Sequence, residues 1–165
     1  MQICAAVLMC LAAGCTSRQG EGLTPQQKAQ IEGEVKAVDD SILATWVRLD
    51  VDATMRYYAP EVVVAEGAER MDFQAYKKAW GDFNKASASL TVAPTRHDCV
   101  VVSKDLAIAT WVGAATLVQR SGDTLLMNPL VYSNVAKKIA GRWLLIYSNP
   151  SASVVVHKAS RARRP

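Results

Sequence analysis

Few side chains in this sequence are of the types that catalyse reactions or bind metal ions. The histidines are His97 and His157, and the chain has no zinc-type His or Cys spacing, glycine-rich phosphate loop or Gly-x-Ser-x-Gly motif. A zinc site or a Ser-His pair would therefore rest on His97 alone. Cys99 begins a Val-rich run at 99–102, which favours a buried small hydrophobic residue over a nucleophile. We expect neither a metal nor a cofactor.

One other cysteine has a context that predicts covalent modification. Residues 2–14 carry no charge, and small residues precede Cys15 in Leu11-Ala12-Ala13-Gly14. This pattern resembles the processing box of bacterial lipoproteins. We expect residues 1–14 to be a signal peptide, Cys15 to carry lipid and residues 15–22 to be a polar tether. The protein would then lie in the bacterial cell envelope, on the periplasmic or outer-membrane side, with a plain secretion signal as the alternative.

The net charge of +4 arises at the end of the chain. Four basic residues lie among the last eight, and the remaining sequence has 15 basic and 15 acidic residues. This balance gives no reason to expect a nucleic-acid partner. We interpret residues 154–165 as a basic, disordered tail.

A long first helix is predicted from local signals. Thr24 can cap it, Pro25 suits its first position and Gln27 completes a capping box. Apolar residues then recur on one helical face, at Ile31, Val35, Val38, Ile42, Trp46 and Leu49. This face must pack against another element.

The rest of the chain predicts an α+β fold. A short helix at 53–58, a Val-rich strand at 61–66 and a helix capped by Asp72 precede strands at 88–95, 99–103, 106–120, 125–138 and 142–149. Such an order favours a cone-shaped, curved antiparallel or mixed sheet that wraps the long helix. The last strand is apolar on both alternating faces, and one helix can cover only one of them. We therefore expect a homodimer through the outer face of the sheet.

The order of these motifs resembles the nuclear transport factor 2-like superfamily, in its SnoaL-like and ketosteroid-isomerase-related bacterial branch. The best motifs are Tyr58-Ala59-Pro60 after Asp50, and Gly141-Arg142-Trp143 followed by Ser151. The resemblance covers residues 23–153 and implies a pocket at the open end of the cone.

The resemblance also implies a site. It places Glu66 where the isomerases carry their general base. Their two oxyanion donors fall on Ile42, which donates nothing, and on Ser133, which has only an ordinary hydroxyl. Asn149 stands where related domains often carry His. We therefore expect a retained carboxylate without efficient ketosteroid isomerisation.

Aromatic residues complete the candidate ligand-binding site, at Trp46, Tyr58, Trp80 and Tyr147. Core packing is the alternative for both tryptophans, and a solvated strand end is the alternative for Glu66. Tyr147 and Asn149 share one face of the last strand. Whether that face is concave depends on the hairpin register, which a shift of one residue reverses.

Three functions remain open at this stage. A pocket that lacks titratable oxyanion donors favours the binding of a small apolar or amphipathic molecule. An isomerase, cyclase or dehydratase with Glu66 as general base is the first alternative. A structural or protein-interaction role, with the cone filled by side chains, is the second.

The lipoprotein signal gives a direct prediction. In protein purified from its native host, mass spectrometry should find an N-terminal Cys15 that carries lipid. A soluble product that begins at another residue would contradict the assignment.

Overall fold

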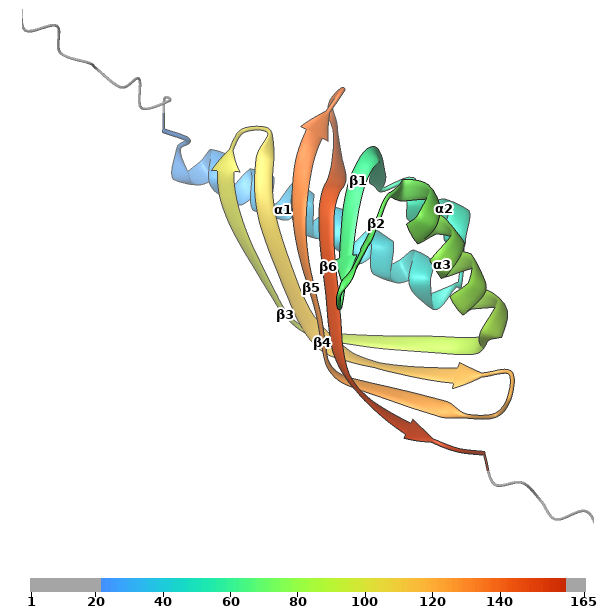
Figure 1. Ribbon diagram of the computed structural model, residues 1–165. Coiled ribbons are helices and arrows are strands. Elements are labelled where there is room, and N and C mark those ends of the chain that lie inside the picture. The colour runs from blue at the N-terminus through green and yellow to red at the C-terminus, as the bar shows by residue number, and fades with distance from the viewer. Residues whose placement is uncertain (1–21, 160–165) are drawn as a thin grey trace, which may run out of the picture.

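A strongly curved sheet holds the first helix in its concave face (Figure 1). The computed structural model describes residues 22–159. Its elements in chain order are α1 (Pro25–Val47), α2 (Val51–Met55), β1 (Tyr58–Glu66), β2 (Glu69–Met71), α3 (Phe73–Ala86), β3 (Ser87–Ser103), β4 (Leu106–Gln119), β5 (Thr124–Ile139) and β6 (Arg142–His157). The six strands lie in the order β2-β1-β6-β5-β4-β3, and β1 is parallel to β6 while the other neighbours are antiparallel. The predicted α+β fold is confirmed.

The predicted start of α1 is confirmed in detail. Thr24 Oγ1 accepts a hydrogen bond from the Gln27 backbone N–H, and Gln27 Oε1 accepts one from the Thr24 N–H. Pro25 takes the first helical turn, where a missing N–H has no cost. The lipidation site at Cys15 lies outside the described residues.

Three predicted boundaries are wrong. Tyr58 opens β1 and pairs with Leu145 instead of ending the second helix. The strands predicted at 88–95 and 99–103 form one strand, β3, with an irregularity between Pro94 and Arg96. A proline fits there because β3 is an edge strand.

The third boundary concerns the end of the domain. The last strand does not stop at Asn149 but runs to His157, which pairs with Thr124 of β5. Residues 154–157 are therefore strand and not disordered tail. Pro150 is tolerated because β1 last pairs with β6 at Ser148, so β6 has only one strand neighbour beyond that point.

Two carboxylates fasten α1 to the sheet. Glu34 Oε2 accepts hydrogen bonds from Lys138 Nζ at 2.8 Å and Trp143 Nε1 at 2.7 Å, and these bonds hold the pKa of Glu34 at about 2. Asp39 is 2% exposed. Its Oδ2 lies 2.8 Å from Nε2 of His97, and its Oδ1 accepts a bond from Asn134 Nδ2 at 3.2 Å.

The Asp39 bonds continue into the sheet. Ser148 Oγ donates to Asn134 Oδ1 at 2.7 Å, so one chain of polar side chains joins α1, β3, β5 and β6. Buried polar groups that satisfy one another in this way fix the relative position of the elements that carry them.

Removal of the Asp39 carboxylate should destabilise the fold strongly. Asp39→Ala leaves the buried Asn134 amide and the partly buried His97 ring without their Asp39 partner, which costs about 2–4 kcal/mol of unfolding free energy. The neighbouring Asp40 pairs with Lys36 on the surface, with 55% of its side chain exposed, so Asp40→Ala should cost less than about 0.5 kcal/mol. Urea unfolding of the two variants measures the contrast, and equal losses would contradict it.

Candidate functional site

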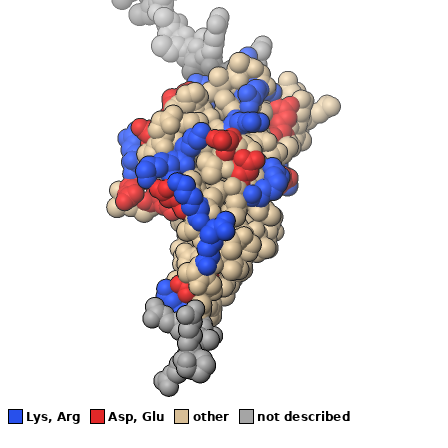
Figure 2. Space-filling model, turned by 90° about the vertical axis from the view of Figure 1, so that its right-hand side faces the viewer, with Lys and Arg blue, Asp and Glu red and all other residues tan. Residues whose placement is uncertain are grey.

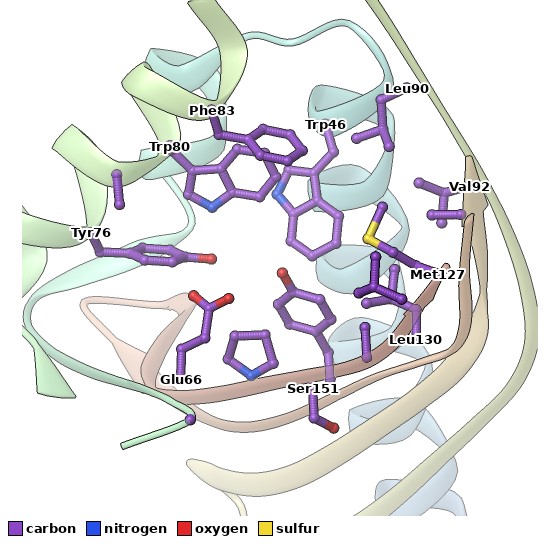
Figure 3. Close-up of a pocket in the computed structure, with 17 residues that line it drawn as sticks. Trp46, Glu66, Tyr76, Trp80, Phe83, Leu90, Val92, Met127, Leu130 and Ser151 are labelled. Carbon is purple, nitrogen blue, oxygen red and sulfur yellow. The ribbon is translucent and has the colours of Figure 1, made fainter. Parts of the chain in front are cut away.

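A cavity of about 560 Å³ opens between α3, the C-terminal end of α1 and one end of the sheet (Figure 3). This end consists of the first residues of β3 and β5 and the last residues of β4 and β6. Apolar and aromatic side chains dominate its wall. The lining residues are Trp46, Glu66, Gly67, Tyr76, Ala79, Trp80, Phe83, Leu90, Val92, Ala115, Met127, Leu130, Tyr132, Pro150, Ser151, Ala152 and Val154. Its volume is in the range of natural sites for small molecules.

The cavity exists because the sheet bends. Register irregularities occur between Pro94 and Arg96 in β3 and between Gly113 and Ala115 in β4. A Cβ on Gly113 would lie 2.5 Å from the Ala93 carbonyl oxygen, so the close approach of β3 and β4 at this point requires glycine at position 113. Bulges of this kind turn strands sharply, and here the turned ends face α3.

Aromatic rings form one side of the cavity. Trp46 of α1 lies 5.2 Å from Trp80 and 4.5 Å from Tyr132, measured between ring centroids. Tyr132 stacks on Trp111 at 5.3 Å, with 7° between the ring planes. On α3, Tyr76, Trp80 and Phe83 follow steps of four and three, which place all three on one helical face.

Polar groups reach the same space from three elements. Figure 3 shows the Glu66 carboxylate and the hydroxyl of Tyr76 pointing toward the middle of the cavity, and Tyr132 of β5 also lines it. The Tyr76 hydroxyl is buried and has no hydrogen-bond partner among the described residues, and the same holds for the Tyr58 hydroxyl and Trp46 Nε1. Burial raises the pKa of all three tyrosines, which keeps them protonated as donors.

Glu66 lies at the exposed end of β1, but its carboxylate faces the cavity. Partial burial raises its pKa, and the charge of Glu69 raises it further. Glu69 is its direct partner across the β1–β2 hairpin. A carboxylate with a raised pKa at a cavity mouth is a candidate for accepting or donating a proton.

The structure brings three of the predicted site residues together. Trp46, Glu66 and Trp80 line the cavity. Tyr58 does not line the cavity but packs against Tyr76, with 5.3 Å between their ring centroids. Ile42 belongs to the buried core.

Ser133, Tyr147 and Asn149 are corrected, because they lie on the other face of the sheet. Ser133 pairs with Asn149 in the ladder, and its Oγ lies 3.2 Å from the Thr110 Oγ1. The ladder joins Val135 to Tyr147 but Ala136 to Leu145, which leaves Ile146 as an extra residue in β6. This bulge changes which residues face inward, from Trp143 and Leu145 before it to Ser148 and Pro150 after it.

Sequence reasoning missed the two tyrosines of the cavity. Tyr76 lies in the helix that the sequence predicts after Asp72, and nothing in the sequence distinguishes its hydroxyl from the helix's other side chains. Tyr132 precedes the expected Ser133 by one residue, so the correct strand register alone would have found it.

The described residues contain no group of three or more His, Cys, Asp or Glu placed to hold a metal ion. Over the same part of the chain, none of the helices has the length and apolar character needed to cross a membrane. On the face that Figure 2 shows, basic and acidic side chains are interspersed, and its lower part is largely uncharged.

Comparison with known proteins identifies similar structures. No family model matches the chain, and no curated protein matches it either. A proposed scytalone dehydratase from Novosphingobium aromaticivorans superposes with a TM-score of 0.74 at 10% identity, over 84% of this chain and 94% of that one.

Two further structures show the same likeness. A hexachlorocyclohexane dehydrochlorinase from Novosphingobium barchaimii has a TM-score of 0.71 at 9% identity, over 86% of this chain and 100% of that one. A nuclear transport factor 2-like protein from Salmonella enterica has a TM-score of 0.69 at 16% identity, over 82% of this chain and 96% of that one. At these identities the likeness is one of fold.

Proposed function

The chain has the nuclear transport factor 2-like fold, and we propose that its cavity binds a small, largely apolar or amphipathic molecule. The observation that carries the proposal is an open cavity into which the buried Tyr76 hydroxyl points, with no hydrogen-bond partner within residues 22–159. An unsatisfied buried hydroxyl costs about 1–3 kcal/mol, and a bound molecule with a polar atom at that point would offset this cost.

The lining also limits the charge of the ligand. Glu66 is the charged residue among the lining residues, which include no Lys, Arg or His within residues 22–159. An anionic molecule would enter a partly desolvated space without a cation to meet it. A carboxylate or phosphate ligand is therefore disfavoured.

A second candidate is a proton-transfer enzyme with Glu66 as general base. The observation in its favour is the Tyr76 hydroxyl, an unpaired donor that faces the same space as the Glu66 carboxylate. Glu66 would remove a proton from carbon, and Tyr76 would donate a hydrogen bond to the oxygen on which negative charge develops. Two similar structures are described as a dehydratase and a dehydrochlorinase.

The third function considered from the sequence, a structural or protein-interaction role, depended on a cone filled by side chains. The open cavity removes that support.

A residue that fills the mouth should abolish ligand binding. Ala152 lines the cavity at an exposed position, so Ala152→Trp should block the cavity without disturbing the core. Ser133→Leu, on the opposite face, is the matched control and should bind as the parent does. Thermal shifts with neutral aromatic and alicyclic compounds measure this, since a ligand at 100 times its Kd stabilises a protein by about 2.7 kcal/mol.

Measurements with the same compounds distinguish a binding protein from a proton-transfer enzyme. Glu66→Gln should keep the thermal shift if the protein only binds, and should abolish product formation if Glu66 is the base. Equal shifts in the parent and Ala152→Trp would contradict a ligand site in this cavity.

We also propose that the domain is held at the membrane by lipid on Cys15, on the periplasmic or outer-membrane side. The support is the apolar leader and small residues before Cys15, together with the polar tether that leads into α1.

A homodimer through the outer face of the sheet is the remaining proposal. An apolar row crosses four strands there: Val100, Ile108, Val135 and Tyr147 are ladder neighbours in turn. Val100 and Ile108 are exposed. An uncovered apolar row of this kind favours a second copy as its cover.

A charge placed in this row should prevent association. Ile108→Lys is expected to give a monomer in light scattering, because a lysine in the middle of the interface would be buried without a partner. Val47→Lys, at an exposed valine of α1, should keep the oligomeric state of the parent. A monomeric parent at tens of micromolar would contradict the proposal.

A further inference from the structure

Two glutamates oppose each other across the β1–β2 hairpin, and one of them, Glu66, lines the cavity. Glu66 and Glu69 are direct cross-strand partners at the tip of the β1–β2 hairpin. Among residues 22–159, neither carboxylate forms an ion pair with Lys, Arg or His. Like charges directly across a ladder destabilise it. The hairpin thus carries a local repulsion that a cation between the two carboxylates would remove.

The space behind these carboxylates suits a cation with an apolar body. Five aromatic residues line the cavity, and its lining includes no basic side chain within the described residues. Aromatic rings attract cations through their faces, most strongly where water is excluded. An ammonium group at the mouth would therefore meet the Glu66 carboxylate, with the charge of its partner Glu69 nearby, and an aromatic wall.

A second and independent observation points to an occupant. The Tyr76 side chain is 3% exposed, its hydroxyl has no partner among the described residues, and it points into the cavity beside Glu66 (Figure 3). A tyrosine hydroxyl can accept a hydrogen bond from an ammonium N–H as well as donate one. Tyr76 thus stands where a polar group of the ligand would be held.

We infer that the cavity binds an amphipathic organic cation, with an ammonium group between Glu66 and Tyr76, near the charge of Glu69, and an uncharged body in the aromatic interior. This inference rests on the proposed ligand-binding function and names the class of molecule. The body extends toward the opposite side of the cavity in Figure 3, where Leu90, Val92 and Met127 lie.

Other occupants account for fewer of these features. A neutral molecule would satisfy Tyr76 but leave the repulsion between Glu66 and Glu69 in place. A metal ion would lack ligands, since the described residues hold no group of three or more suitable side chains. An organic cation satisfies the hydroxyl, reduces the repulsion and fills the apolar space.

A set of probes with the same ring and a four-carbon chain, but with head groups of different charge, tests the inference. Phenylbutylamine, phenylbutanol and phenylbutanoate share a ring and a linker, and calorimetry with the full domain measures their Kd values. The amine should bind at least about tenfold more tightly than the alcohol, and the butanoate most weakly. Sodium chloride should weaken binding of the amine and not of the alcohol.

Substitutions in the β1–β2 hairpin test which carboxylates cause the preference for the amine. Glu66→Gln should abolish the preference for the amine over the alcohol, and Glu69→Gln should reduce it about threefold. Glu61→Gln is the matched control, since Glu61 is an exposed carboxylate of the same strand outside this cavity.

The outcomes separate this inference from the function on which it rests. If the alcohol binds as tightly as the amine and Ala152→Trp blocks both, the cavity is a ligand site but the cation class is wrong. If the amine preference persists in Glu66→Gln, the inferred position of the charge is wrong. If none of the three probes binds, neither the inference nor the proposed binding function holds.

Discussion

The bend of the sheet is the constraint on which the site depends. Without it, β3 to β6 would continue past α1 as a flat extension with two solvent-facing sides. The close approach of β4 to Ala93, possible only because position 113 is glycine, turns the strand ends toward α3. Helix α3 then covers part of the bent region, and the space left between them is the cavity.

Much of the fold could be predicted because its signals are local. The capping box at Thr24 and the apolar steps of α1 depend on neighbouring residues in the sequence, and both are present in the structure. Which residues of a strand face the inside of the sheet could not be predicted in the same way. The bulge at Ile146 is set by the pairing of β6 with β5, and it reverses the faces of Tyr147 and Asn149.

The chain of buried polar side chains at Asp39 could not be predicted from the sequence either. In the sequence, Asp39 is not one of the apolar positions of the predicted first helix, and His97 is an isolated histidine. Their contact joins residues 58 positions apart. A sequence pattern reports which residues are apolar, but it does not report where two distant polar residues satisfy each other inside the fold.

The cavity keeps groups that stability alone would not favour. A phenylalanine at position 76 would preserve the ring contacts with Tyr58 and Trp80 and would bury no unpaired hydroxyl. A neutral residue at position 69 would remove the repulsion across the hairpin. Tyr76 lines the cavity, and so does Glu66, the partner of Glu69 across the hairpin. Departures from stable packing that converge on one space are characteristic of binding sites, where a ligand supplies the missing partner.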